Sequence, residues 1–126
     1  MGKQVIRAAG VPETGGPFNL CVRHGDTLYV SGLPPFDRQV RVVMDHLKAL
    51  VEAAGSNMDC LLKVIVWLKD QRQQEDFDRV YRTYFSSAEA LPARTRMQAG
   101  RTPMDCALEV EAIGYVPQPP AATPAA

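Results

Sequence analysis

The sequence predicts an α+β domain in which two helices pack on one face of a six-stranded sheet. Two stretches of apolar residues recur at helical spacing, whereas six shorter segments have the alternation or the β-branched content of strands. Two helices are too few to cover both faces of such a sheet, so the other face should meet water or another subunit. The 126 residues suffice for one domain and are too few for two.

The predicted elements follow one another in the order β-β-β-α-β-α-β-β. Gly25-Asp26 separates the second and third strands and is typical of a tight hairpin turn. Asp37 is a candidate N-cap for the first helix, and Gly55 should end it. The segment LLKVIVWL, Leu61–Leu68, is a nearly continuous apolar run typical of a buried central strand. The helical stripes are Val40, Val43, Met44, Leu47, Leu50, Val51 and Ala54, then Phe77, Val80, Tyr81, Tyr84 and Phe85; the remaining strands are expected at Gln4–Arg7, Leu20–His24, Thr27–Ser31, Thr95–Ala99 and Cys106–Tyr115.

Alternation along the last two strands predicts which side chains lie on the face without helices. In the final strand, the apolar even positions from 106 to 112 should face the helices, which leaves Glu109 and Glu111 on the other face. In the strand before it, Arg94 and Arg96 share one face, which we also expect to be the helix-free one. These two arginines and two glutamates would form either a solvated surface or the wall of a cleft between subunits.

Composition and charge give no support to several classes of function. Lys+Arg and Asp+Glu both number 14, so nothing predicts a broad face for nucleic acid. No apolar run approaches the roughly 20 residues that span a bilayer, and the first ten residues lack the apolar region of a secretory signal. The three cysteines have neither a disulfide framework nor metal-ligand spacing with the two histidines. We therefore expect a cytoplasmic protein without a metal.

The C-terminal end has a different composition from the rest of the chain. From Val116 onward it reads VPQPPAATPAA, which is rich in proline and alanine and cannot join a helix or a central strand. We expect a single domain over residues 1–115 and a disordered tail over residues 116–126.

A series of short motifs resembles the RidA/YjgF family of imine and enamine deaminases, also called the endoribonuclease L-PSP family. The resemblance covers about residues 3–115 and rests on the order of the motifs rather than on any one of them. It implies a chorismate-mutase-like fold, with the last strand central in a mixed sheet and the Arg94 strand at its edge, and a homotrimer with clefts between subunits. The motifs are Gly16-Pro17-Phe18, Tyr29-Val30-Ser31-Gly32, LVEAAG at 50–55, KVIVWLKD at 63–70, Asp76-Phe77 through Tyr84-Phe85, Pro92-Ala93-Arg94-Thr95 and LEVEA at 108–112.

The resemblance implies hydrolysis of 2-imino and 2-enamino acids to 2-keto acids and ammonia, without a cofactor. An iminium carbon is already electrophilic, so the site must hold the carboxylate, place one water and manage protons. Arg94 matches the family's carboxylate-binding arginine, whose guanidinium fits a carboxylate bidentately. Glu109 matches the glutamate near the attacking water, which orients that water and carries a proton to the leaving nitrogen. Glu111 shares its face and is interpreted as structural.

Four further positions correspond to the family's pocket. Ser31 and Gly32 match the strand end that lines it, although a plain strand-end serine remains an alternative interpretation for Ser31. Phe18 stands where many deaminases have tyrosine, so it can wall the cleft but cannot donate a hydrogen bond. Asp78 stands where the family often has asparagine, and it is either a pocket residue or a solvated acid on a helix.

Arg96 is the sharpest departure from the family, because typical members carry cysteine two residues after the carboxylate-binding arginine. Three interpretations stay open. Arg96 is a second anion anchor for a dicarboxylate, as would suit an aminomuconate-type deaminase. Alternatively, it pairs with Glu109 or Glu111 and weakens ordinary imine hydrolysis, or it forms a simple structural ion pair.

Two features leave an alternative function open. Only residues 33–37 separate Gly32 from the first helix, where family members usually have a longer loop that edges the cleft. The departures at Phe18, Asp78 and Arg96 also favour a divergent, non-catalytic trimer that binds a small carboxylate. A ribonuclease is less favoured, because the sequence has no catalytic histidine pair and no basic excess.

Overall fold

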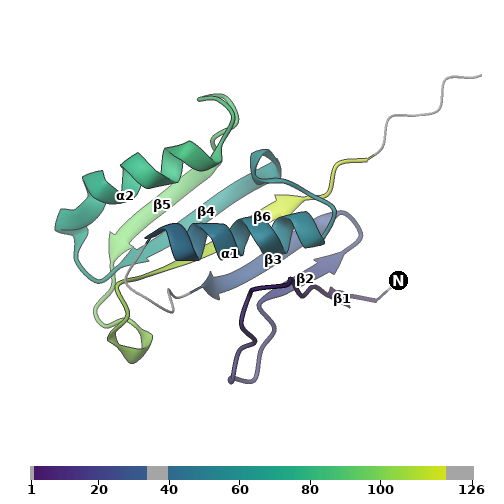
Figure 1. The fold of residues 1–126 in the computed structure, drawn as a ribbon, viewed down its shortest axis with the longest axis horizontal. Helices are drawn as coiled ribbons and strands as arrows, with labels where there is room; N and C mark the ends of the chain where they lie inside the picture. Colours follow the sequence, from purple (N-terminus) through teal and green to yellow (C-terminus); the bar gives the residue numbers. More distant parts are fainter. Residues whose placement is uncertain (1, 34–39, 119–126) are drawn as a thin grey trace, which may run out of the picture.

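The structure is a computed structural model that describes residues 2–33 and 40–118. Within these ranges, two helices lie on one face of a single sheet (Figure 1). Asp37, most of the 33–37 connection and the last eight residues of the predicted tail lie outside the described residues. The strands are β1 (Gln4–Val5), β2 (Cys21–His24), β3 (Thr27–Leu33), β4 (Leu61–Leu68), β5 (Ala93–Gln98) and β6 (Leu108–Tyr115), and the helices are α1 (Val40–Ala53) and α2 (Gln74–Tyr81).

The sheet has the strand order β1-β2-β3-β6-β4-β5. The last strand, β6, lies centrally and pairs antiparallel with both β3 and β4. The edge strand β5 pairs parallel with β4, which is possible because the α2 segment carries the chain back along the sheet between them. The mixed sheet, the central last strand and the edge position of the Arg94 strand are therefore confirmed.

The apolar stripe of α1 forms the centre of the core, as predicted. Gly55 ends this helix with a φ of +87°, a conformation that favours glycine. The amide of Ser56 then donates to the Val51 carbonyl at 2.9 Å, which satisfies one of the last carbonyls of the helix. The side chains of this helix that are buried against the sheet are Val43, Met44, Leu47, Leu50 and Val51.

The second helix is shorter than its aromatic stripe. It ends at Tyr81, and the chain continues as a 3₁₀ turn, Arg82–Tyr84. The rings of Phe77, Tyr81 and Phe85 follow one another with centroids 5.4 and 5.0 Å apart. This aromatic row closes the core on the side of β5.

The strand register corrects one prediction, because Arg94 and Arg96 lie on the helix-covered face and not with the two glutamates of β6. Arg94 pairs with Val64 and Arg96 with Val66, and both valines are fully buried under the helices. Alternation shows which residues of one strand share a face, but the phase between neighbouring strands depends on their pairing register. The two glutamates do lie on the open face, as predicted, where Glu109 pairs with Trp67.

A β-bulge in β3 brings Ser31 and Gly32 together on the open face. The flanking residues Val30 and Leu33 are both buried on the helix side, and their partners on β6 lie only two positions apart. Two residues of β3 therefore lie opposite one residue of β6. Neither the bulge nor its position was predicted from the sequence.

The folded part continues past the end of β6. Val116 is buried in the core, and its amide donates to the carbonyl of Asp26 at 2.6 Å. The side-chain amide of Gln118 also donates to the Asp26 carboxylate. The start of the proline-rich segment is thus held against the β2–β3 turn.

Candidate functional site

Asp78 on α2 joins the two arginines of β5 into one group, which we call the arginine cluster (Asp78, Arg94 and Arg96). Asp78 Oδ1 accepts hydrogen bonds from Arg94 Nη1 at 2.7 Å and from Arg96 Nη1 at 2.5 Å. Arg96 also donates from Nη2 to Gln74 Oε1 at 3.1 Å. The interpretation in which Arg96 pairs with Glu109 or Glu111 is therefore wrong. Asp78 pairs with both arginines and is therefore not a solvated helix acid.

Two aromatic rings hold the guanidinium of Arg94 from the helix side. Arg94 Cζ lies 4.8 Å from the ring centroid of Tyr81 and 5.8 Å from that of Phe77. At such distances the ring quadrupole attracts the cation. Both rings belong to α2, so the packing of this helix on β5 positions them beside the guanidinium.

A pocket of about 610 Å³ opens beside Arg94, between α2 and the segment that leads into β5. The hydroxyl of Tyr81 is buried and has no hydrogen-bond partner among the described residues. Burial raises the pKa of Tyr81 to about 12, so this hydroxyl remains a donor at neutral pH. The pocket thus offers a cation, a hydroxyl and apolar walls, which suit a small organic anion. It is lined by Asp78, Tyr81, Arg82, Phe85, Ser87, Ala88, Leu91, Pro92 and Arg94.

Tyr81 was predicted only as a core residue of the second helix. The sequence signal that could have indicated a further role is the hydroxyl of a tyrosine within a mainly apolar helical stripe, because a buried hydroxyl needs a hydrogen-bond partner. Only the packing of α2 on β5 showed that the hydroxyl lies at the pocket beside Arg94.

Asp78 is a carboxylate at neutral pH. Its partial burial raises the pKa, but the hydrogen bond from Arg94 and the charges of both arginines outweigh burial and hold it below the ordinary value. The arginine cluster therefore contains two cations and one anion, and its net charge is positive.

The open face carries a second group, which we call the glutamate cluster (Ser31, Gly32, Glu109 and Glu111). A β-carbon placed on Gly32 would lie 2.7 Å from Glu109 Oε2, so only a glycine leaves room for this carboxylate. Glu111 Oε1 accepts a hydrogen bond from Trp67 Nε1 at 3.1 Å, which supports its structural interpretation.

Glu109 is the carboxylate in the glutamate cluster that is suited to proton transfer. Its side chain accepts no hydrogen bond from any residue that the structure describes. Burial raises the pKa of Glu109, and the negative charge of Glu111 raises it further. The shift favours the protonated form, which is the direction that a proton donor requires.

A hydrogen bond joins Ser31 to Asn19, the residue that follows Phe18 in the chain. The hydroxyl of Ser31 donates to the Asn19 carbonyl at 2.7 Å, so its oxygen is left to accept a hydrogen bond. The ring of Phe18 is 50% exposed and packs against Gly16. An exposed phenylalanine at this position can form the wall of a cleft that a second surface completes.

The predicted site residues therefore fall into two groups on opposite faces of the sheet. Asp78, Arg94 and Arg96 lie on the helix side, whereas Ser31, Gly32 and Glu109 lie on the open side. Phe18 is linked to this second group only through Asn19, the next residue in the chain, whose carbonyl accepts the Ser31 hydroxyl. A single chain does not bring Arg94 and Glu109 to the same ligand.

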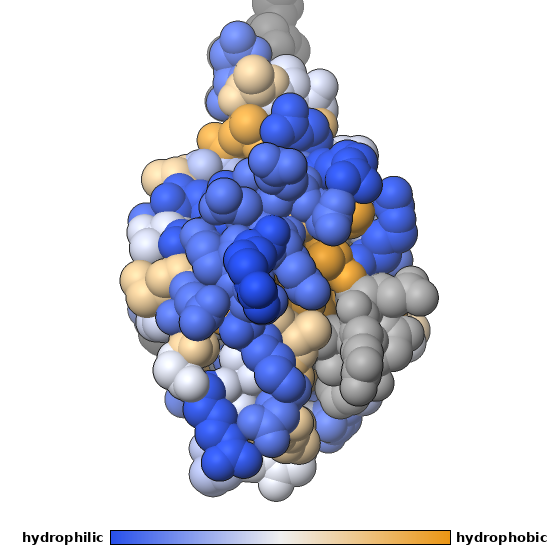
Figure 2. Space-filling model, turned by 90° about the vertical axis from the view of Figure 1, so that its left-hand side faces the viewer, coloured by the Kyte–Doolittle hydropathy of each residue, from blue (hydrophilic) through white to orange (hydrophobic). Residues whose placement is uncertain are grey.

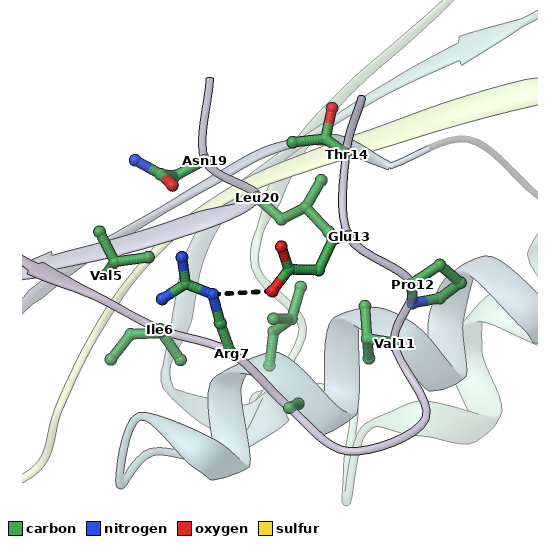
Figure 3. A pocket seen from close by; sticks show the side chains of 11 residues that line it. Val5, Ile6, Arg7, Val11, Pro12, Glu13, Thr14, Asn19 and Leu20 are labelled. Atoms are coloured by element: carbon green, nitrogen blue, oxygen red, sulfur yellow. Dashed lines mark hydrogen bonds and ion pairs between the residues drawn. The ribbon is translucent and has the colours of Figure 1, made fainter. Parts of the chain in front are cut away.

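A different hollow near the N-terminus is less suited to a site. It measures only about 80 Å³, and Arg7 Nε donates across it to Glu13 Oε1 at 2.9 Å (Figure 3). Both side chains of this pair are exposed, so the pair is largely screened by water.

The end of the molecule where α2 begins and β5 ends is largely hydrophilic (Figure 2).

Within residues 2–33 and 40–118, no group of three or more His, Cys, Asp or Glu side chains is placed to hold a metal. No described helix is long and apolar enough to cross a membrane.

The fold and the two clusters define a small α+β domain with an arginine-lined pocket at its sheet edge. The sequence model of the family described as Endoribonuclease L-PSP matches residues 9–116. The chain therefore belongs to this family, which is the RidA/YjgF family that its motifs resemble.

Relatives of known name cover almost the whole chain. A RutC family protein of Pyrococcus horikoshii is 34% identical over 125 aligned residues, which span 90% of this chain and 98% of that protein. TdcF of Escherichia coli, by name a candidate reactive intermediate deaminase, is 29% identical and spans 88% of this chain and 95% of its own. The crystal structure of E. coli TdcF with bound serine has a TM-score of 0.81 at 29% identity, covering 89% of this chain and 98% of that one. The crystal structure of the E. coli YjgF gene product has a TM-score of 0.80 at 30% identity, with the same coverage.

The alignment with the P. horikoshii protein also bears on chain length. Its 125 aligned positions include only 90% of the 126 residues here, or about 113, so roughly 12 positions of the relative have no counterpart in this chain.

Proposed function

We propose that the protein is a deaminase that hydrolyses 2-imino and 2-enamino acids to 2-keto acids and ammonia. The observation that carries the proposal is the guanidinium of Arg94, which is held between Asp78 and the Tyr81 ring at the edge of a pocket. Such an arrangement suits a small carboxylate with an apolar or short side chain. The deaminase name of TdcF, a relative over most of the chain, supports the same class of reaction.

We further propose that the site is shared between subunits of a homotrimer, with Arg94 from one subunit and Glu109 from its neighbour. Two clusters on opposite faces of one sheet favour such sharing. In a symmetric oligomer, the open face of one subunit can pack against the sheet edge of its neighbour, which carries Arg94. The open face also exposes large apolar side chains, which are typical of a surface that another chain covers. Those on the strands of this face are Tyr29, Met97, Ile113 and Tyr115.

In this site Arg94 binds the substrate carboxylate and so fixes the position of the neighbouring imine carbon. Glu109 orients a water, whose oxygen adds to that carbon while a proton passes to the carboxylate. Starting from the protonated imine, Glu109 then returns the proton to the nitrogen. The C–N bond breaks and ammonia leaves as the hydroxyl proton passes to the Glu109 carboxylate and the carbonyl forms. No oxidant or cofactor enters this balance, and the oxygen of Ser31 is placed to accept a hydrogen bond from the water or the imine.

The proposal is tested with an amino-acid oxidase that generates 2-imino acids in the presence of the purified protein. The wild type should clear the imino acid and release ammonia faster than buffer does, whereas Arg94→Ala should not. Arg79→Ala is the matched control, because Arg79 is exposed and pairs with Asp76 of its own helix. If the wild type and Arg94→Ala clear the imino acid at the buffer rate alike, the proposed activity is wrong.

A second candidate function is a trimer that binds a small carboxylate without turnover. It is favoured by Asp78, whose carboxylate already holds Arg94 where the family often has an uncharged asparagine. The crystal structure of TdcF contains bound serine, a small molecule with a carboxylate. Saturable binding of a 2-keto acid together with the absence of imine hydrolysis would identify this second function.

We also propose that the protein acts in the cytoplasm. All three cysteines are free, and two of them are buried, which suits a reducing compartment.

A further inference from the structure

Asp78 poses an electrostatic problem for the proposed site. Its carboxylate donates nothing and accepts a hydrogen bond from Arg94, the same guanidinium that would hold the substrate. A lone Asp78–Arg94 pair would be neutral, and the fixed carboxylate would repel an incoming one. The chain needs a further cation at this point if Arg94 is to bind an anion.

Arg96 has the position that such a cation requires. Its Nη1 donates to the same Oδ1 atom of Asp78, and its side chain is only 12% exposed, against 23% for Arg94. Its Nη2 donates to Gln74, and its Nε is buried without a partner among the described residues. Arg94 and Asp78 line the pocket of about 610 Å³, whereas Arg96 is absent from its lining. Arg96 therefore faces the protein and not a ligand.

The other charged group at the pocket is Arg82. Its side chain is exposed and donates from Nε to the backbone carbonyl of Asp78 at 3.3 Å, so it leaves the Asp78 carboxylate to the two arginines of β5. Its charge is screened by water at the pocket rim. Arg82 does not replace Arg96 as the partner of Asp78.

We propose that Arg96 is a positioning residue that neutralises Asp78 and thereby leaves Arg94 free to bind one substrate carboxylate. Asp78 and Arg96 are then a matched pair, which stand where the family often has asparagine and usually has cysteine. Arg96 is not an anchor for a second carboxylate, so the site takes monocarboxylates in preference to dicarboxylates. This inference rests on the proposed carboxylate site at Arg94 but not on turnover.

The test is a double-mutant cycle on ligand binding by the full-length protein. The dissociation constant for 2-oxobutanoate, a 2-keto acid with one carboxylate, is measured by calorimetry for the wild type, Arg96→Met, Asp78→Asn and the double variant. Arg96→Met should weaken binding by about tenfold, because the negative charge of Asp78 is then balanced by Arg94, the same arginine that should bind the ligand. Adding Asp78→Asn to that variant should restore binding to within about threefold of the wild type, since both charges are then absent.

Two further measurements separate charge from structure. Arg96→Lys should bind nearly as well as the wild type, because a lysine retains the charge that the inference requires, and thermal melts report whether each variant is folded. The dicarboxylate 2-oxoglutarate should bind the wild type more weakly than 2-oxobutanoate, and Arg96→Met should not selectively weaken it.

Several results would overturn the inference. It is wrong if Arg96→Met leaves the dissociation constant unchanged, if the two substitutions are additive, or if Arg96→Lys behaves as Arg96→Met does. It is also wrong if the wild type binds neither keto acid. Binding that follows the expected cycle without imine hydrolysis would instead contradict the proposed activity and leave the role of Arg96 intact.

Discussion

The carboxylate of Glu109 packs against the backbone of Gly32, so closely that a β-carbon on Gly32 would lie 2.7 Å from Oε2. This contact joins the β-bulge of β3 to the central strand β6. It also limits where the Glu109 carboxylate, the proposed proton-transfer group, can lie. Because the contacting atom is the far end of a flexible side chain, a larger residue at position 32 would displace Glu109 rather than unfold the sheet.

We expect Gly32→Ala to lower imine hydrolysis by about 100-fold, as displacement of a catalytic group by about 1 Å does. The melting temperature should change little. Gly15→Ala is the control, because nothing lies within 4 Å of a β-carbon there. Equal activity of Gly32→Ala and wild type would show that the contact does not position Glu109.

Glu109→Gln should stabilise the protein at neutral pH. Burial, helped by Glu111, raises the pKa of Glu109 in the folded state, so the folded protein holds this proton more tightly than the unfolded chain. The carboxylate is then increasingly unfavourable for folding as pH rises above the unfolded value and through the folded one. Urea denaturation from pH 4 to pH 8 should show a stability gain that grows with pH, and Glu75→Gln on α2 serves as an exposed control.

Asp78→Asn should act in the opposite direction. The pKa of Asp78 is lowered on folding, because the two arginines outweigh the opposing effect of burial. The carboxylate therefore contributes fully to the stability of the fold above the ordinary pKa of 3.8, and this contribution is lost as pH falls through the folded pKa. We expect a loss of about 1–3 kcal/mol at pH 7, as for other charged hydrogen bonds that lose one partner. Asp76→Asn, in an exposed pair, should cost far less. A loss that persists undiminished at pH 2 would contradict this account.

Arg94→Lys should lower kcat/KM by about 10- to 100-fold while the protein stays folded. A lysine preserves the charge but lacks the fork that binds a carboxylate bidentately, and the guanidinium that lies 4.8 Å from the Tyr81 ring centroid is lost. Steady-state kinetics with the oxidase-coupled assay measure this effect. Arg101→Lys is the matched control, since Arg101 is exposed and pairs with Asp105.

Tyr81→Phe should separate stability from binding. In the free protein the Tyr81 hydroxyl is buried without a described partner, so its removal should leave the melting temperature unchanged or raise it. If the hydroxyl meets the ligand in the pocket, the same substitution should weaken the binding of 2-oxobutanoate by about fivefold to tenfold. Binding equal to that of the wild type would place the ligand away from Tyr81.

Local patterns were sufficient for most of the fold. The run Leu61–Leu68 was predicted with the bounds that β4 has, and Gly55 ends α1 with the positive φ expected of it. Such features depend on residues close together in the chain, because helical spacing, strand alternation and turn geometry are local properties. The order of β6 and β5 in the sheet came only from the family resemblance, because alternation within a strand does not determine which strands are its neighbours.

By itself, the sequence determined the family, the element order and Arg94 as the anion-binding residue that we propose. Only the tertiary structure decided which residues surround Arg94. Alternation placed Arg94 and Arg96 on one face, but the pairing of β5 with β4 decided that this face is the helical one, where Asp78 lies. The physical reason is that alternation is set within a strand, whereas register and helix packing are set by contacts between segments far apart in the chain.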